Sequence, residues 1–330
     1  MSNRLLLNIV LAGATFAAGL APAVAQQSLR LAHHHAVGSA IDLTANKFAE
    51  IVNERSKGTL LIKVFPAAQL GQEREAYGLC NSGVIDLCIT SLGIVDQAYP
   101  PINVTSLPFV FRDWNHVYQA YDGKFGAALA EGVKTQTKTQ VLGYIHLGFR
   151  DMLFRGDPIR SAAGMKGVKM RSPEAAVWIR MFEALGARPT PVTWGEVYSA
   201  MQTGIADGLE APPLTALDNK FNEVVKSLVR TQHMFASLAI FGSSAKLGRL
   251  SKPQQDILLA AGQEAAKWSN TTISQPGESE AYKRMTALGM TVVDPTNIDD
   301  WSKPMRPMWQ EMTSKIAGSE RLLNLIIETK

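Results

Sequence analysis

Short apolar segments alternate with helical ones between residues 29 and 89, and this order restricts the possible folds more than any other feature of the chain. Three segments have the apolar and β-branched composition of strands: residues 29–32, 59–65 and 84–89. Between them, residues 41–54 carry apolar side chains at helical spacing, and residues 69–83 form a second helix. Strands that alternate with helices build doubly wound α/β domains, so we expect a largely parallel sheet covered by helices.

The N-terminal 25 residues have the composition of a secretory signal peptide. Arg4 precedes an apolar run, and Ala23-Val24-Ala25 forms an A-x-A cleavage sequence. Pro22 interrupts the apolar run, which favours a cleaved signal over a membrane anchor. We therefore expect a periplasmic protein whose mature chain begins near Gln26. Because about 305 residues exceed what one hydrophobic core usually serves, we also expect two domains.

The composition narrows the class of protein. Apolar residues make up 46% of the chain, and the mean hydropathy is close to zero, as in globular proteins. No apolar run after the N-terminal segment reaches the roughly 18–20 residues that a membrane helix needs. The formal net charge is +4 and no basic block is present, which argues against nucleic-acid or lipid-surface binding.

The chain contains two cysteines, Cys80 and Cys88. An exported protein meets an oxidising compartment, so a disulfide between them is permitted. Their spacing suits a helix end that turns back into a strand, but spacing alone does not set the distance between the two Cα atoms. A disulfide and a pair of buried thiols are therefore both open alternatives.

Two arginines follow predicted strands in the middle of the chain. Residues 141–148 form a strand that ends shortly before Arg150, and a later buried strand ends in Arg171. Ser172-Pro173 then has the pattern of an N-cap and a first helical residue. Ligands of open α/β sheets bind at the carboxyl ends of strands, and a guanidinium matches a carboxylate bidentately. Each arginine can instead tie a loop or pair with a nearby acid, and the sequence leaves both alternatives open.

The second half of the chain predicts a capped helix, a long β segment and a long helix. Thr193 and Glu196 have the spacing of a capping box. Residues 228–245 are apolar with β character. Residues 252–288 have helical spacing interrupted at Pro276-Gly277, so we expect a long, kinked helix that crosses both domains.

The sequence carries no catalytic motif. It contains no G-x-S-x-G elbow, no H-E-x-x-H, no P-loop and no G-x-G-x-x-G after a strand. His33-His34-His35 is a candidate metal site, but adjacent residues point in different directions, so three consecutive histidines rarely bind one ion. We expect no metal or cofactor, and one of these histidines lining a cleft as a hydrogen-bonding side chain.

The exported part of the chain resembles the DctP-type periplasmic solute-binding proteins of tripartite ATP-independent periplasmic (TRAP) transporters. The resemblance covers nearly all of it and rests on the order and spacing of four segments: residues 48–75, 82–93, 107–111 and 164–213. It implies an α/β fold with two domains, as in other periplasmic binding proteins, in which each domain is a mixed sheet flanked by helices and a long helix crosses both. The expected domains are residues 26–148 with about 239–276, and residues 149–238 with about 277–330, with the ligand cleft between them.

The resemblance also implies a binding site. The family's carboxylate-binding arginine falls on Arg171, and a frequent second arginine falls on Arg150. Ala211 stands where relatives often have Asn, which disfavours sialic-acid-like or ectoine-like binding. The expected ligand-binding residues are Arg171, Arg150, Glu73, His33, His35, Trp194, Glu210 and Phe235.

We therefore expect a monomeric receptor, not an enzyme, that binds a small organic acid and delivers it to the small and large membrane permease subunits of a TRAP transporter. A sugar acid such as a uronate or aldonate suits two cations, an acid and a histidine. A simpler mono- or dicarboxylate, or an aromatic acid, is the alternative ligand. Two alternative functions are an exported hydrolase or lyase and a ligand-sensing partner of a signalling receptor.

Overall fold

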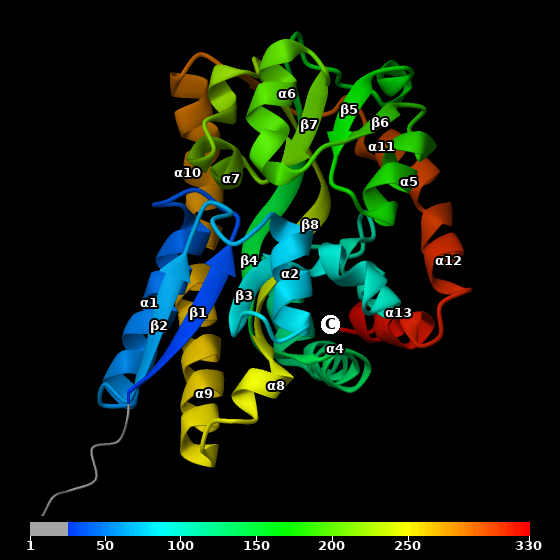
Figure 1. Cartoon of the computed structure of the whole chain (residues 1–330). Helices are drawn as coiled ribbons and strands as arrows, with labels where there is room; N and C mark the ends of the chain where they lie inside the picture. The colour runs from blue at the N-terminus through cyan, green and yellow to red at the C-terminus, as the bar shows by residue number, and fades with distance from the viewer. Residues whose placement is uncertain (1–25) are drawn as a thin grey trace, which may run out of the picture.

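A computed structural model describes residues 26–330, so the predicted signal peptide lies outside the described part of the chain. One mixed sheet runs through the molecule, in the strand order β2-β1-β3-β8-β4-β7-β5-β6, with β9 paired to β8 (Figure 1). The strands are β1 (Gln27–His33), β2 (Leu60–Phe65), β3 (Leu87–Ser91), β4 (Thr139–Phe154), β5 (Lys169–Ser172), β6 (Arg188–Pro191), β7 (Gly208–Ala211), β8 (Ser227–Ser243) and β9 (Thr291–Val293).

Helices cover the sheet on both faces, as the α/β alternation in the sequence predicts. None of the helices within residues 26–330 is both long and apolar enough to span a membrane. The helices are α1 (Ala40–Arg55), α2 (Glu73–Asn81), α3 (Trp114–Asp122), α4 (Lys124–Gln136), α5 (Ala176–Ala184), α6 (Val197–Thr203), α7 (Pro213–Asp218), α8 (Ser244–Leu247), α9 (Lys252–Ser269), α10 (Gln275–Ala287), α11 (Ile298–Met305), α12 (Pro307–Thr313) and α13 (Ser319–Ile327).

The two longest strands, β4 and β8, join the two ends of the sheet. They pair with each other in antiparallel fashion over nearly their whole length, and at opposite ends they add β3 and β7, also antiparallel. The expectation of a largely parallel sheet is therefore wrong for the centre of the molecule, although β1–β2, β1–β3 and β5–β6 are parallel. The predicted strand at residues 141–148 is also too short, because β4 continues to Phe154 and contains Arg150.

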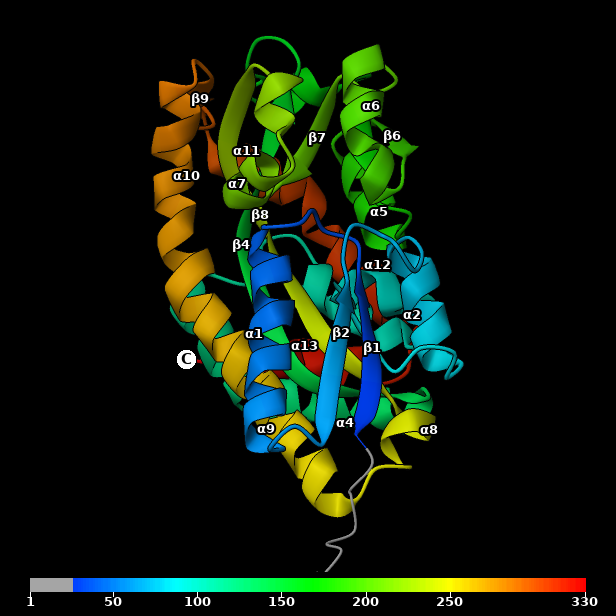
Figure 2. The same cartoon turned by 60° about the vertical axis from the view of Figure 1, so that its left-hand side comes forward.

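The long helix predicted for residues 252–288 is present. It consists of α9 and α10, joined without a break by a π-helical turn at Asn270–Ser274. Figure 2 shows the two helices in line along one side of the molecule, with α1 packed beside α9. At the π turn, the Asn270 amide accepts from the backbone N–H of His146 (2.7 Å) and donates to the Tyr144 carbonyl (3.1 Å).

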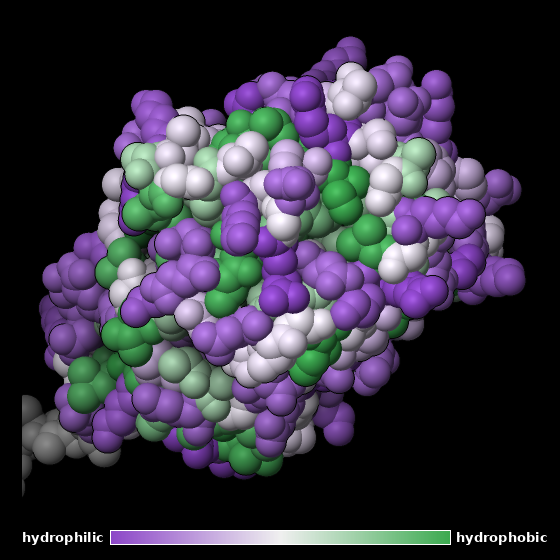
Figure 3. Space-filling view, turned by 90° about the horizontal axis from the view of Figure 1, so that it is seen from above, coloured by the Kyte–Doolittle hydropathy of each residue, from purple (hydrophilic) through white to green (hydrophobic). Residues whose placement is uncertain are grey.

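The buried apolar side chains form four clusters, two around β1–β3 and two around β5–β7. The last helix, α13, packs with α4 and with the short helical turn η2 (Pro100–Ser106), so it lies beside the N-terminal half of the chain. Figure 3 looks onto the end of the molecule that carries β5–β7 and shows a mainly hydrophilic surface with separate apolar patches. The cavity described below lies between the two groups of clusters.

Three predicted helix signals differ from the structure. Ser172 does not cap a helix: it is the last residue of β5, its carbonyl accepts from Val192 N–H (3.0 Å), and α5 begins only at Ala176. Ser172 therefore pairs with the adjacent segment of the sheet instead of capping a helix. Thr193 precedes a short helical turn, but its hydroxyl donates to the Glu196 carboxylate (2.8 Å) instead of capping the backbone. The sequence predicts a single helix over about residues 115–133, whereas the structure has two helices, α3 and α4, separated by the extended Gly123.

The possible disulfide between Cys80 and Cys88 is not formed, and both cysteines are buried free thiols. Cys80 lies on α2 and Cys88 in β3. The Cys80 thiol lies 3.9 Å from the Asp86 carbonyl and 3.8 Å from the Phe241 carbonyl, and burial raises the pKa of the Cys88 thiol well above its usual range. The two thiols therefore act as small core side chains.

Candidate functional site

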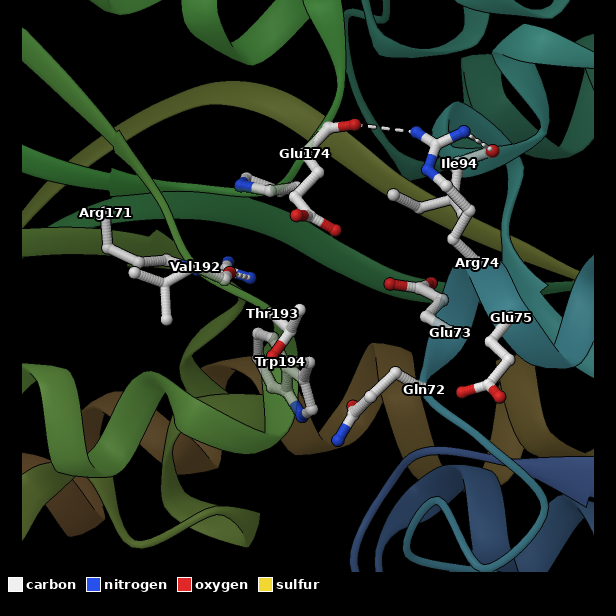
Figure 4. A pocket seen from close by; sticks show the side chains of 11 residues that line it. Gln72, Glu73, Arg74, Glu75, Ile94, Arg171, Glu174, Val192, Thr193 and Trp194 are labelled. Atoms are coloured by element: carbon white, nitrogen blue, oxygen red, sulfur yellow. Dashed lines mark hydrogen bonds between the residues drawn. The ribbon is translucent and has the colours of Figure 1, made fainter.

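A cavity of about 340 Å³ lies between α2, the turn η1 (Leu92–Gln97), β5 and the segment before α6 (Figure 4). A narrow recess of about 30 Å³ shares Glu73, Ile94, Arg171, Pro173 and Trp194 with it. The remaining residues that line the two spaces are Gln72, Arg74, Glu75, Glu174, Val192 and Thr193 in the cavity, and His34, His35, Ser91, Leu147, Arg150, Trp178, Thr215 and Leu238 in the recess.

Arg171 is a buried cation that forms no salt bridge with any acidic side chain of residues 26–330. Its side chain is 2% exposed, and its Nε and Nη2 donate to the Val192 carbonyl at 3.0 and 2.8 Å. Its Nη1 is buried and has no hydrogen-bond partner among the described residues. Burial lowers the pKa of the guanidinium to about 10, which still leaves it charged at neutral pH. A buried charge needs a counterion, so an anion that enters the cavity has its partner here.

Arg150, in contrast, already has a carboxylate partner. Its Nε and Nη2 donate to the two carboxylate oxygens of Glu210, and Nη2 also donates to the Glu210 backbone carbonyl (2.9 Å). Glu210 is fully buried in β7, and His233 Nε2 lies 3.7 Å from its carboxylate. Burial alone would raise the pKa of Glu210, but the charge and hydrogen bonds of Arg150 hold it below its usual value. Glu210 thus lies behind Arg150 and is not among the residues that line the cavity.

Glu73 places a carboxylate on the wall opposite Arg171. It is the first residue of α2, where the helix dipole stabilises negative charge. Its Oε1 accepts from the Ser91 backbone N–H (2.7 Å) and from the Thr90 hydroxyl (3.3 Å), and His34 Nε2 lies 3.6 Å away. These contacts fix the carboxylate on the cavity wall and leave Oε2 without a hydrogen bond to the described residues.

The three consecutive histidines have different surroundings. His33, the last residue of β1, turns away from the cavity and contacts Asp42 through Nε2 (3.2 Å). His34 and His35 line the recess. Burial lowers the pKa of His34 to about 3 and that of His35 well below its usual range, so both are neutral. Within residues 26–330 no cluster of three His, Cys, Asp or Glu side chains could hold a metal ion.

Two aromatic side chains of the expected site have different positions. Trp194 lines the cavity, packs on His35 with ring centroids 5.7 Å apart, and donates from Nε1 to Asn219 (3.2 Å). Phe235 is instead part of an aromatic core cluster, with its ring centroid 4.9 Å from those of Trp114 and Phe149. Phe235 therefore lines neither the cavity nor the recess, and apolar packing in β8 accounts for its burial.

Several cavity residues were not predicted. Arg74 crosses the cavity mouth: its guanidinium donates to the carbonyls of Ile94 (2.9 Å) and Glu174 (2.6 Å), as Figure 4 shows. Trp178 lines the recess with its buried Nε1, which has no hydrogen-bond partner within residues 26–330. In the sequence, Trp178 has helical spacing with Ala175, Phe182 and Leu185, a pattern that predicts the apolar face of a helix. The sequence signal that could have identified Arg74 as a cavity residue is its position directly after Glu73.

The geometry suits capture of a small anion that also carries hydroxyl groups. Arg171 supplies an unbalanced positive charge on one wall, and Glu73 supplies hydrogen-bond acceptors on the other. Neutral His34 and His35, together with Trp178, add polar ring atoms that can donate or accept between them.

The comparisons with known proteins agree with this geometry. The chain is 30% identical over 290 residues to the 2,3-diketo-L-gulonate-binding periplasmic protein YiaO of Escherichia coli, with 87% of each chain covered. Among solved structures, the TRAP periplasmic solute-binding protein of Sulfitobacter sp. with bound β-D-galacturonate has a TM-score of 0.86 and 28% identity, covering 91% of this chain and 99% of its own. The corresponding protein of Polaromonas sp. with bound D-erythronate has a TM-score of 0.87 and 26% identity, covering 92% and 99%.

The sequence profile of bacterial extracellular solute-binding protein, family 7, known as DctP, matches residues 31–316. This range includes every residue that lines the cavity and the recess. The chain belongs to the DctP family of bacterial extracellular solute-binding proteins.

Proposed function

We propose that this chain is a periplasmic receptor that binds a sugar acid, such as a uronate or aldonate, and delivers it to the small and large permease subunits of a TRAP transporter. The observation that carries the proposal is the buried guanidinium of Arg171, whose Nη1 has no partner among the described residues. The bound ligands named for the similar structures, galacturonate and erythronate, are both hydroxylated monocarboxylates, which supports the choice of ligand class.

In this proposal Arg171 forms the salt bridge with the ligand carboxylate. Arg150 assists through the part of its guanidinium that Glu210 does not occupy. Glu73 accepts from ligand hydroxyls, His34 or His35 contacts a further oxygen, and Trp194 packs on the carbon skeleton. Exclusion of water from the cavity strengthens each of these contacts, because charges interact more strongly at low dielectric.

We further propose that the protein is a monomer and that its two lobes close around the ligand, as in other periplasmic binding proteins. One lobe comprises residues 26–148 with about 239–276, and the other comprises residues 149–238 with about 277–330, except that α13 packs on the first. A ligand that touches both walls favours the closed state, since it gains contacts only there. We propose that the protein binds the acid without converting it. Chemical analysis of the acid after incubation with the protein tests this directly, because the acid should be recovered unchanged.

A thermal-shift screen against sugar acids, simple mono- and dicarboxylates and aromatic acids tests the proposal. A binding ligand at a hundredfold excess over Kd should add about 2.7 kcal/mol to the free energy of unfolding. Arg171→Met should weaken the best ligand at least about 100-fold, because removal of one partner of a buried ion pair costs about 3–5 kcal/mol.

Arg188→Met is the matched control, since Arg188 is exposed on the adjacent strand β6. We expect this variant to bind like the wild type in isothermal titration calorimetry. The proposal fails if no carboxylate stabilises the protein, or if folded Arg171→Met retains wild-type affinity. Preference for a simple or aromatic acid would overturn the sugar-acid assignment alone.

A further inference from the structure

We propose that Glu73 determines ligand specificity by charge: it rejects a second carboxylate, so that the receptor takes hydroxylated monocarboxylates and excludes the dicarboxylates of the same carbon skeleton. This inference rests on the proposed function, because it assumes that Arg171 binds the first carboxylate. It assigns a role to the wall of the cavity opposite Arg171, where Glu73 lies.

The Glu73 carboxylate lacks a cationic partner among the described residues. The adjacent Arg74 is engaged elsewhere: its Nη1 pairs with Asp96 (3.0 Å), and its Nη2 donates to the Glu174 carbonyl (2.6 Å). His34 lies 3.6 Å from Glu73, but burial keeps that imidazole neutral. Glu73 therefore has no salt bridge to a Lys or Arg side chain among the described residues, and its half-buried carboxylate lies on the wall shared by the cavity and the recess.

The positive charge available to a ligand is also limited. Glu210 balances Arg150 through a bidentate pair, which leaves Arg171 as the cation without an acidic partner among the residues that line the cavity and recess. One ligand carboxylate satisfies Arg171. A second carboxylate on the same small molecule would have no cation to meet and would approach Glu73.

Hydrogen bonding at Glu73 separates the same two ligand classes. Oε1 is held by Ser91 N–H and Thr90 Oγ1, while Oε2 has no hydrogen bond to the described residues. An ionised carboxylate only accepts hydrogen bonds. A ligand hydroxyl can donate to Oε2, whereas a ligand carboxylate offers no donor and repels the like charge. The site therefore favours a ligand with a hydroxyl group, such as a ring hydroxyl of a uronate, at the end remote from Arg171.

The test compares the strongest monocarboxylate of the screen with the dicarboxylate of the same skeleton and configuration, for example an aldonate with its aldarate. Isothermal titration calorimetry gives the affinity ratio for the wild type, Glu73→Gln and Glu54→Gln. We expect the wild type to prefer the monocarboxylate at least 30-fold. Glu73→Gln, which keeps the acceptor for Ser91 N–H, should reduce that preference at least tenfold.

Glu54→Gln is the matched control, because Glu54 is exposed on α1 and lines neither the cavity nor the recess. It should leave the preference within about threefold, since water and salt screen exposed charges. Equal affinity of the wild type for both acids, or an unchanged preference in folded Glu73→Gln, would overturn the charge filter while the receptor proposal stands. Absence of binding by every carboxylate would refute the receptor proposal itself.

Discussion

At the scale of single residues, Trp178 is the cavity side chain whose contribution is most sharply testable. Its indole is 5% exposed, lies 5.8 Å from the Arg150 guanidinium carbon, and lines the recess with an Nε1 that has no partner among the described residues. A buried donor without a partner costs free energy that a ligand oxygen can recover.

We therefore expect Trp178→Phe to weaken ligand binding about tenfold, the equivalent of roughly 1–2 kcal/mol for one hydrogen bond. The phenyl ring retains most of the packing, so the ligand-free protein should keep its stability. Trp301→Phe is the control: Trp301 belongs to the same apolar cluster but donates from Nε1 to the Arg160 carbonyl (3.4 Å). Titration calorimetry with both variants decides, and equal losses of affinity would show that ring packing and not the indole N–H matters.

Two of the residues expected from sequence, Arg171 and Glu73, line the cavity. Arg171 was expected from its place at the carboxyl end of a strand, which has a fixed position in such a sheet, and Glu73 was expected from the resemblance to the family. Which of the three histidines faces the recess depends on how the chain leaves β1. The backbone N–H of Ala67 donates to the His35 carbonyl and that of Ala68 to the His33 carbonyl, and these hydrogen bonds set the turn. No local pattern encodes these contacts.

At the scale of elements, the close approach of η1 to α5 joins the two sides of the cavity. A Cβ added at Gly93 in η1 would lie 2.5 and 2.7 Å from two ring carbons of Trp178 in α5, and 2.8 Å from Ser106 Oγ. Carbon atoms do not approach so closely, so glycine is required for this packing.

Gly93→Ala should therefore hold the walls of the cavity apart. We expect ligand affinity to fall at least tenfold, with a smaller effect on the free energy of unfolding of the ligand-free protein, which can relieve the contact by opening. Gly78→Ala in α2 is the control, because nothing lies within 4 Å of the added Cβ and alanine favours an exposed helix. Urea unfolding and titration calorimetry separate the two effects. A loss of stability in Gly93→Ala with normal affinity would contradict this account.

Element types were more predictable than the way elements pair. The spacing of apolar residues gave the existence of β1–β3, of the β segment at 228–245 and of the long helix, since each has a clear period. The antiparallel return of β4 along β8 was not predictable, because it depends on contacts between segments about ninety residues apart. The position of Glu210 behind Arg150 depends on a second antiparallel pairing, that of β4 with β7, in which Met152 opposes Glu210. It was not predictable for the same reason.

At the scale of the whole molecule, Asp151 links the elements that run between the two ends of the sheet. It is fully buried in β4, at the irregular pairing of β4 with β8, and accepts from Gln232 N–H of β8 (3.0 Å) and from the Tyr282 hydroxyl of α10 (2.6 Å). Glu278 of α10 and Arg230 of β8 are the charged groups that act on it. Burial raises the pKa of Asp151 to about 7 despite both hydrogen bonds.

This shift predicts that stability falls as the pH rises. The pKa of Asp151 in the folded protein lies above the ordinary value, so between about pH 4 and pH 7 the folded state holds a proton that the unfolded state has released. Proton release from the folded state is half complete near pH 7, and the loss of stability levels off about one pH unit above it. Asp151→Asn removes this titration. Its advantage over the wild type should grow through that window to roughly 2–4 kcal/mol.

Urea unfolding of the ligand-free protein, followed by circular dichroism at pH 5, 6, 7 and 8, measures the difference. Asp300→Asn, at an exposed position in α11, is the control and should differ from the wild type by a constant amount over this range. A constant difference for Asp151→Asn as well would mean that Asp151 is ionised in the folded protein throughout, so that its hydrogen bonds to Gln232 and Tyr282 outweigh the cost of burial. A growing difference would identify the link between β4, β8 and α10 as the source of the pH dependence, because a carboxyl at that point is stable in the folded protein mainly when it is protonated.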